Sequence, residues 1–418
     1  MLEVLQTISA ILILVMGIVF FYQVAYLFVP YIIPKRKRQR TPGGVKKHRF
    51  AVLIAARNEQ NVIPHLLHSI QNQDYPADLI TPFVVADNCT DATADVAREN
   101  GAVVYPRFNT EQVGKGYALN YLLERINEDY GWDQFDCYMI FDADNVLLPN
   151  YFTEMNKVCA EGYKAFTGYR NTKNVASSWV SAGYTIWYLH DSCHLNQSRN
   201  RLGLTCAVTG TGFGFTTELL KEMNNWNYFT LTEDIEFSTW CAVRGIRIGY
   251  CHDAILFDEQ PKTFRQSWRQ RTRWSQGGIQ VTFGYTKEYA KGLIAGGRTT
   301  YSTLETLTLS LYGYMLGILC ACISLATAFL QGGLGAAGIL ILSLLAGTYS
   351  STFLLAAWTL VTEWKRIRAT TWQKIFCAFC FPLYILTWAP ISATAMFRKF
   401  EWTPIEHTEA VDVESLNK

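Results

Sequence analysis

Three long stretches of the chain, residues 4–34, 306–362 and 375–397, contain no charged residue and no histidine. A helix needs about 20 apolar residues to cross the roughly 30 Å hydrocarbon core of a bilayer, so each stretch is long enough to span one. All 37 Lys and Arg and all 35 Asp and Glu of the 418 residues lie elsewhere. The remainder has the charge density of a soluble domain. This segregation predicts a soluble domain joined to membrane helices, and it excludes a purely soluble, a disordered and a disulfide-stapled secreted protein.

The first apolar run is predicted to be a membrane anchor and not a signal peptide. Acidic Glu3 precedes it, and no small-residue cleavage site follows it. The run 306–362 is too long for one helix and breaks at residues 331–333, Gln-Gly-Gly, which predicts two spans with a tight turn. The run 375–397 contains two prolines. It either crosses the membrane or forms a kinked, interfacial or re-entrant segment.

Basic residues flank these spans. Residues 35–49 carry eight Lys and Arg and no acid, which is typical of the cytoplasmic side of a membrane protein. We therefore expect an integral protein of the cell (plasma) membrane with its soluble domain in the cytoplasm. The net charge of +2 argues against a nucleic-acid partner. The expected division is an anchor (1–34), a basic flank (35–49), a soluble domain (50–260), amphipathic interface helices (261–300), a C-terminal membrane region of two to three spans (301–397) and a tail (398–418).

Strands alternate with helices in the first part of the soluble domain. Apolar runs predict strands at 50–56, 83–86, 102–105 and 137–141, and helical spacing predicts helices at 60–72, 92–100 and 117–127. This alternation predicts an α/β fold with a doubly wound, mostly parallel sheet. In such sheets ligands bind beyond the carboxyl ends of the strands.

Polar residues follow three of the predicted strands at that edge. Arg57 and Glu59 follow the first, Asp87 the second, and Asp142 and Asp144 the last. Their convergence indicates a nucleotide-like ligand. The paired aspartates offer hard oxygen donors that suit Mg²⁺ or Mn²⁺, although two solvated acids in a turn would give the same pattern.

Three further segments each have two interpretations. Lys115 lies between glycines and could contact a phosphate, although the phosphate-loop pattern is absent. Residues 232–234, Thr-Glu-Asp, precede a helical pattern and could be only an N-terminal cap. Gln270, Arg273 and Trp274 share one helical face, in a basic aromatic segment that could otherwise lie among lipid headgroups.

Taken in order, seven motifs resemble those of the membrane-integrated family 2 glycosyltransferases. This branch includes cellulose, chitin, hyaluronan and poly-N-acetylglucosamine synthases and the ceramide glucosyltransferases. The motifs cover roughly residues 50–275, and the first lacks the proline common in the family. They are Ala55-Ala56-Arg57-Asn58-Glu59, Ala86-Asp87-Asn88-Cys89-Thr90-Asp91, Gly114-Lys115-Gly116 with Ala118-Leu119-Asn120, Asp142-Ala143-Asp144, Gly210-Thr211-Gly212, Thr232-Glu233-Asp234 and Gln270-x-x-Arg273-Trp274.

The resemblance implies a GT-A fold and inverting transfer from a nucleotide sugar, usually a UDP-sugar, with Mg²⁺ or Mn²⁺ as cofactor. The implied donor-binding residues are Arg57, Glu59 and Asp87 for the uridine, Lys115 for the nucleotide, Asp142 and Asp144 for the metal diphosphate, and Gln270 and Arg273 for the diphosphate. The implied acceptor-side residues are Gly210, Thr211, Glu233 and Trp274, with Asp234 as the base.

This chemistry is physically consistent. One carboxylate takes the proton of the attacking hydroxyl, while a cation and Arg273 stabilise the leaving diphosphate. The leading prediction is a processive synthase that extends a β-linked polysaccharide at the membrane. The alternative is a non-processive transferase that adds one sugar to a lipid acceptor. A third possibility, an inactive glycan-export or scaffold subunit, conflicts with the retention of Asp144, Asp234 and Arg273.

Overall fold

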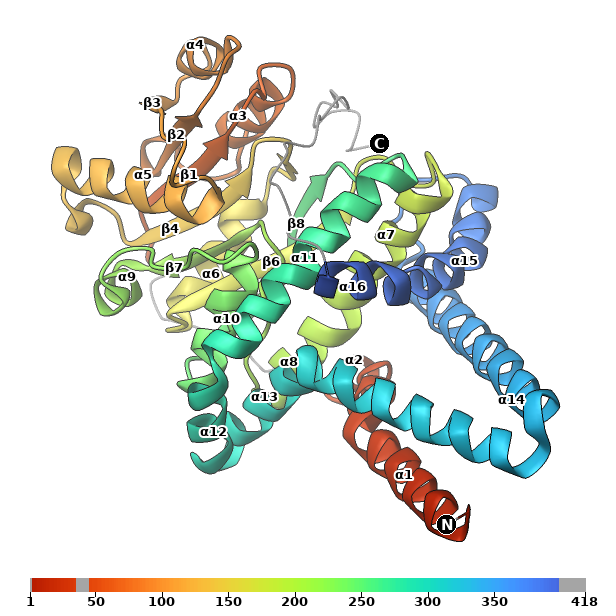
Figure 1. Ribbon diagram of the computed structural model, residues 1–418. Helices are drawn as coiled ribbons and strands as arrows, with labels where there is room; N and C mark the ends of the chain where they lie inside the picture. The colour runs from red at the N-terminus through yellow and green to blue at the C-terminus, as the bar shows by residue number, and fades with distance from the viewer. Residues whose placement is uncertain (1, 35–44, 398–418) are drawn as a thin grey trace.

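A computed structural model describes residues 2–34 and 45–397, so most of the basic flank and the whole tail lie outside the described residues. A domain of strands and short helices occupies one end of the molecule, and long helices project from it (Figure 1). The helices before the membrane region are α1 (Leu2–Tyr26), α2 (Val29–Ile32), α3 (Ile63–Gln71), α4 (Thr93–Glu99), α5 (Lys115–Tyr130), α6 (Tyr151–Ala160), α7 (Trp179–His190), α8 (Gln197–Leu202), α9 (Thr217–Met223), α10 (Glu233–Val243), α11 (Phe264–Gly284), α12 (Thr286–Ile294) and α13 (Gly297–Thr308).

The domain is built on one mixed sheet with the strand order β3-β2-β1-β4-β7-β6-β8-β5. The first four strands of that order are parallel, as the strand–helix alternation predicts. Strand β7 runs antiparallel to both of its neighbours, so the sheet is mixed from there on. The strands are β1 (Phe50–Ala56), β2 (Ile80–Asp87), β3 (Val103–Arg107), β4 (Cys137–Asp142), β5 (Val146–Leu147), β6 (Ala165–Thr172), β7 (Phe213–Thr216) and β8 (Ile248–Asp258).

The sheet is buried on both faces. Alternate residues of β1 enter two different apolar clusters: Leu53 packs with α5, whereas Val52 packs with α3 and α6. A strand buried on both faces reads as a continuous apolar run, which is why β1 was recognisable in the sequence. The chain winds outward from β1 in both directions, so the carboxyl ends of β1 and β4 lie at a topological switch point, where ligands bind in such sheets.

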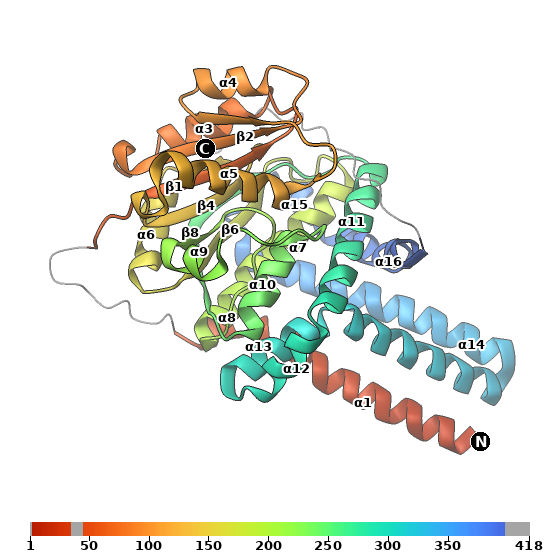
Figure 2. The same ribbon diagram turned by 60° about the vertical axis from the view of Figure 1, so that its left-hand side comes forward.

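Among the described residues, three helical segments are long and apolar enough to cross a membrane. Two of them, α1 and α14 (Leu311–Glu363), project from the domain in the same direction (Figure 2). The helical path of α14 is broken at Gly332 and at Gly333, whose φ of 63° suits glycine. The break lies at the residues where the sequence predicts a turn. The first span ends at Tyr26, earlier than the apolar run, because a short helix with Pro30 follows it.

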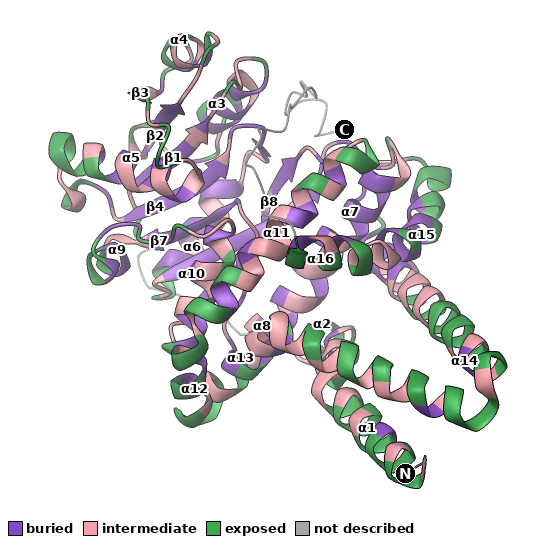
Figure 3. Cartoon of the chain, in the orientation of Figure 1, coloured by how far each residue is buried: buried purple, intermediate pink, exposed green. Residues whose placement is uncertain are grey.

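The third segment consists of α15 (Thr371–Leu386) and α16 (Trp388–Phe397). Protein covers 39% of its most apolar window, against 6% for α1 and for α14. In Figure 3, purple is frequent on α15, whereas α1 and α14 are mostly pink and green. Helix α15 packs on α7 and α14, and α16 packs on α11. Of the alternatives left open by the sequence, this packing favours a kinked segment held against the domain.

Candidate active site

A cavity of about 420 Å³ lies beside the carboxyl edge of the sheet. Eight of the residues predicted to form the site line it, although they come from five separate segments of the chain. They are Lys115, Asp142, Gly210, Glu233, Asp234, Gln270, Arg273 and Trp274.

Lys115 is the first residue of α5 and points at two other parts of the site. Its Nζ donates to Asp142 Oδ1 at 2.5 Å and to the Gly210 carbonyl oxygen at 2.6 Å. It lies 3.9 Å from Glu233 Oε1. Burial by itself would lower the pKa of Lys115, but the two carboxylates raise it above its ordinary value. A Cβ on Gly116 would collide with the Tyr228 carbonyl, so glycine there lets α5 approach the loop before α10.

Two carboxylates, Glu233 and Asp234, stand in the first turn of α10. Thr232 makes no side-chain cap, so capping by its hydroxyl does not explain the motif. Burial raises the pKa of Glu233 to about 7, against the effect of Lys115. Burial also raises the pKa of Asp234, opposed by the Ile235 N–H and by Lys115. Carboxyls with raised pKa values in a cavity are candidates for proton transfer.

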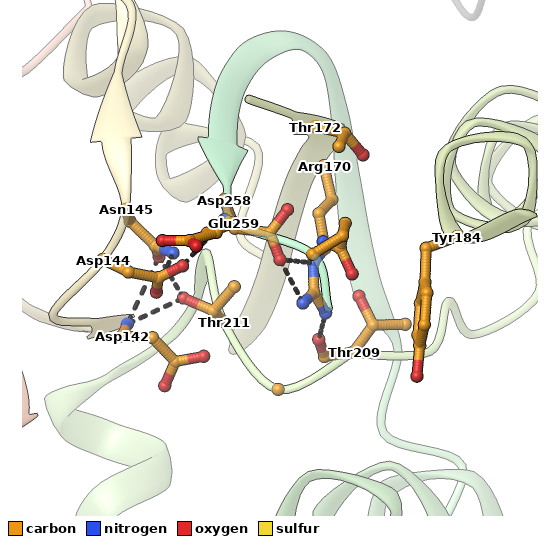
Figure 4. Close-up of polar contacts among 12 residues, drawn as sticks. Asp142, Asp144, Asn145, Arg170, Thr172, Tyr184, Thr209, Thr211, Asp258 and Glu259 are labelled. Carbon is orange, nitrogen blue, oxygen red and sulfur yellow. Dashed lines mark hydrogen bonds and ion pairs between the residues drawn. The ribbon is translucent and has the colours of Figure 1, made fainter. Parts of the chain in front are cut away.

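The turn after β4 holds the predicted metal residues (Figure 4). The backbone N–H of Asp142 donates to Thr211 Oγ1 at 2.9 Å. The side chain of Asp142 lines the cavity. Asp144 is buried; one oxygen accepts from Asn145 Nδ2 at 3.2 Å and the other from the Glu259 N–H at 2.8 Å. Asp144 and Thr211 thus lie behind the cavity wall. A carboxylate oxygen has more than one lone pair, so an aspartate that accepts hydrogen bonds can also coordinate a cation.

Two aspartates fit a divalent cation only if other ligands complete its shell. In the described parts of the chain, no three His, Cys, Asp or Glu side chains gather in a way that could hold a metal ion. Mg²⁺ is usually bound through one or two carboxylates together with substrate phosphates. The donor set here therefore fits a cation bound with a diphosphate and does not fit an all-protein metal cage.

Helix α11 presents one face to the cavity, as the spacing of its residues predicts. Gln270 Oε1 accepts from the Tyr184 hydroxyl at 2.7 Å, and Arg273 Nη1 donates to the Leu231 carbonyl at 2.8 Å. The Trp274 ring stacks on Trp388 of α16, with centroids 6.4 Å apart. The face therefore joins the loop before α10 to the C-terminal helices.

Comparison with known proteins identifies this arrangement. The model of the family described as "Glycosyltransferase like family 2" matches residues 48–277. The chain belongs to this family. It is therefore a glycosyltransferase, and its mixed sheet is the GT-A fold.

Two curated relatives and one solved structure are similar to this glycosyltransferase. A probable glycosyltransferase, YdaM, of Bacillus subtilis (strain 168) is 26% identical over 58% of this chain and 58% of its own length. The poly-β-1,6-N-acetyl-D-glucosamine synthase of Staphylococcus epidermidis is 26% identical over 67% of this chain and 62% of its own. The match thus spans less than two thirds of either relative.

The solved structure is the mannosyltransferase PcManGT of Pyrobaculum calidifontis, in complex with GDP-Man and Mn²⁺. It has a TM-score of 0.59 and 20% identity, and the match covers 91% of this chain and 99% of the mannosyltransferase. At this identity the likeness establishes the fold.

Three predicted donor residues of the glycosyltransferase, Arg57, Glu59 and Asp87, stand at the ends of β1 and β2, outside the lining of the cavity. Asp87 forms a buried ion pair with Arg107 at 2.6 Å. Arg107 ends β3, and its pairing was not predictable from the sequence because its partner is 20 residues away. The structure thus separates the predicted uridine residues from the eight that line the cavity.

The glycosyltransferase also has site residues that sequence reasoning missed. Arg170, at the end of β6, lines the cavity, and its Nε donates to Asp258 Oδ2 at the end of β8 at 2.8 Å (Figure 4). Neither strand was predicted, so nothing indicated that these two ends meet. A prediction of both strands with their parallel pairing would have found the pair.

The cavity of the glycosyltransferase reaches the membrane helices. Leu311 and Tyr314, at the start of α14, line it together with Ser392 and Met396 of α16. Its far end is therefore built from the segment that leads into the second span.

Proposed function

We propose that this glycosyltransferase transfers a sugar from a UDP-sugar to a growing β-linked polysaccharide at the membrane, with inversion. One observation carries the proposal. A lysine, an arginine and two carboxyls with raised pKa values, Lys115, Arg273, Glu233 and Asp234, surround a single cavity that runs from the sheet edge to the start of α14.

The proposed roles follow from the position of each group. Asp234 takes the proton of the acceptor hydroxyl as that hydroxyl attacks the anomeric carbon. Lys115 and Arg273 offset the negative charge that builds on the leaving diphosphate. Trp274 lines the cavity and is proposed to offer an aromatic surface to the acceptor sugar. Glu233 and Gly210 complete the acceptor side.

The proposed cofactor is Mg²⁺ or Mn²⁺, held by Asp142 and Asp144. The donor set fits such a cation, and the similar mannosyltransferase was solved with GDP-Man and Mn²⁺. When bound, the cation supplies positive charge to the diphosphate. Arg57, Glu59 and Asp87 are proposed to hold the uridine, at the neighbouring strand ends of the same sheet edge.

A polysaccharide product is supported by the relatives that are named poly-β-1,6-N-acetyl-D-glucosamine synthases. A second candidate is the addition of one sugar to a lipid acceptor. It is favoured by the membrane end of the cavity, where Leu311, Tyr314 and Met396 offer an apolar lining to a lipid chain.

The proposed topology puts the domain in the cytoplasm of a cell-membrane protein. The end of α14 returns to the domain, where Arg366 Nη2 lies 3.4 Å from Asp253 Oδ1. The basic segment after α14 is therefore on the same side as the domain, which agrees with the preference of basic loops for the cytoplasm.

The test is to incubate membranes that contain the protein with radiolabelled UDP-sugars, with GDP-mannose as a further donor, and to size the product. A ladder or polymer supports the polysaccharide proposal, and a single added sugar in the lipid fraction supports the second candidate. Membranes with the Asp234→Asn variant serve as the control. Absence of labelled product with every donor would refute both.

A further inference from the structure

We propose that Arg170 and Asp191 form a binding subsite for hydroxyl groups of the acceptor sugar, with Tyr188 as the residue that positions Arg170. This inference rests on the proposed function. None of the three residues belongs to the seven motifs, yet all three line the cavity that contains Asp234.

The guanidinium of Arg170 is held rigidly with part of its hydrogen-bonding capacity left over. Nε donates to Asp258 Oδ2 at 2.8 Å, Nη2 donates to the same oxygen, and Nη1 donates to the Thr209 carbonyl oxygen. Its Cζ lies 3.7 Å from the centroid of the Tyr188 ring. These bonds to described residues use three of the five N–H groups of a guanidinium. The other two remain for a ligand in the cavity.

Arg170 and the proposed base face the same point. A Cβ placed on Gly210 would lie 3.7 Å from Asp234 Oδ2 and 3.9 Å from Arg170 Nη1. A sugar held by Arg170 therefore has a neighbouring hydroxyl within reach of Asp234. The Gly210 carbonyl also accepts from Lys115, so the consecutive carbonyl groups of Thr209 and Gly210 are held by Arg170 and by Lys115 respectively.

Asp191 reaches the cavity because the helix changes its winding there. Helix α7 ends at His190 and continues as a π-helical turn, η3 (Asp191–Asn196). Such turns are rare and are frequent at functional sites. The Asp191 carboxylate accepts from Asn196 Nδ2 at 3.3 Å, and burial raises its pKa to about 6, against the effects of Arg199 and Arg170.

The cavity lining carries both signs of charge, since Asp191, Glu233 and Asp234 line it together with Lys115, Arg199 and Arg273. A carboxylate that shares a site with the Arg170 guanidinium suits a neutral polyol, which can donate to it, better than an ionised phosphate or carboxylate, which it repels. A sugar diol, in contrast, accepts hydrogen bonds from a guanidinium and donates them to a carboxylate. Since Arg170 covers one face of the Tyr188 ring, we assign that ring to positioning and not to sugar stacking.

The test measures transfer by the full-length protein in membranes. The donor is the UDP-sugar that the wild type uses, and the acceptor is an N-acetylglucosamine tetramer at increasing concentration. For Arg170→Lys and Asp191→Asn we expect at least a tenfold rise in the KM for the tetramer. We expect the KM for the donor, and its hydrolysis without acceptor, to stay within twofold of wild type. Tyr188→Leu should behave like Arg170→Lys, and Tyr188→Phe like wild type.

Arg247→Lys is the matched control, because Arg247 also stacks on a tyrosine, with Cζ 5.1 Å from the Tyr163 ring, but does not line the cavity. A wild-type KM for the tetramer in both Arg170→Lys and Asp191→Asn would overturn the subsite. The subsite would also be overturned if Arg170→Lys and Asp191→Asn lost donor hydrolysis by as large a factor as the KM for the tetramer rises. Such a result would indicate a donor-side or structural role. A wild type that uses no nucleotide sugar would instead refute the proposed function, and the subsite with it.

Discussion

The replacement of Asp234 by Asn tests the proposed base most directly. Asp234 lies in the first turn of α10 and accepts from the backbone N–H of Ile235. Asparagine has nearly the same shape and keeps an oxygen for that bond, so the cavity and the donor-binding groups should be preserved. General-base catalysis typically contributes about 10²–10⁴-fold in rate. We therefore expect kcat to fall by that factor, which corresponds to about 3–5 kcal/mol of activation free energy.

The pH dependence of the transfer rate is a second test of Asp234 as the base. Burial raises the pKa of Asp234 above the ordinary 3.8, so it is protonated, and inactive as a base, at a pH where an exposed aspartate is still ionised. The rate should thus fall as the pH is lowered through this raised value. Glu233, with its pKa of about 7, is largely protonated over the acid range in which Asp234 titrates, so Glu233→Gln should leave this acid limb in place.

The assay combines initial rates of labelled sugar transfer between pH 4.5 and 8 with calorimetric titration of UDP into the detergent-solubilised protein. Asp95→Asn is the control, since Asp95 is an exposed partner of Arg98, remote from the cavity. Transfer by Asp234→Asn within tenfold of wild type would refute the base assignment. A loss of UDP binding as large as the loss of rate would also refute it, because the defect would then lie in the donor site.

Three further predictions follow from other contacts. Excess EDTA should abolish transfer, with recovery on adding Mg²⁺ or Mn²⁺; an undiminished rate would contradict the proposed cation. Arg199→Met should lower the free energy of unfolding by about 3–5 kcal/mol, because it removes the buried ion-pair partner of Glu305, which lies 2.6 Å away. Denaturation in detergent measures this loss. The double variant with Glu305→Gln should recover part of it. Gly116→Ala should raise the KM for the donor by displacing Lys115. Gly284→Ala is the control, because Gly284 has open space around it and its KM for the donor should not change. The same KM for the donor in both variants would contradict this prediction.

The parts of the fold that the sequence predicts are those where local pattern and burial agree. Strands β1 and β2 are buried on both faces and stand out as apolar runs, and their ends carry the polar residues that mark the sheet edge. The face of Gln270, Arg273 and Trp274 follows from helical periodicity alone. The break at residues 331–333 follows from two glycines in an apolar run.

The parts of the fold and of the site that the sequence does not predict depend on contacts between residues that are distant in the chain. Strand β6 has Gly168 in its middle and ends in Arg170, Asn171 and Thr172, so its sequence forms no apolar run that indicates a strand. Its partners β7 and β8 come more than 40 residues later. The ion pair of Arg170 with Asp258 requires their parallel pairing, which no local pattern contains. The course of residues 375–397 was open for the same reason: composition does not show which apolar helix is covered by protein.

The long apolar helices also contribute to the cavity. Gln270 and Trp274 lie on α11, after the sheet ends; Trp388 of α16 stacks on Trp274, and the start of α14 lines the same cavity. The sheet edge contributes Lys115 and the aspartate turn, that is, the proposed donor half. The proposed acceptor half combines residues of the domain, Gly210, Glu233 and Asp234, with Trp274 of α11, the helix that packs on α16. If the proposed function holds, an acceptor reaches this half of the cavity next to helices that are long and apolar enough to cross a membrane, which is the arrangement that transfer to a membrane-associated chain requires.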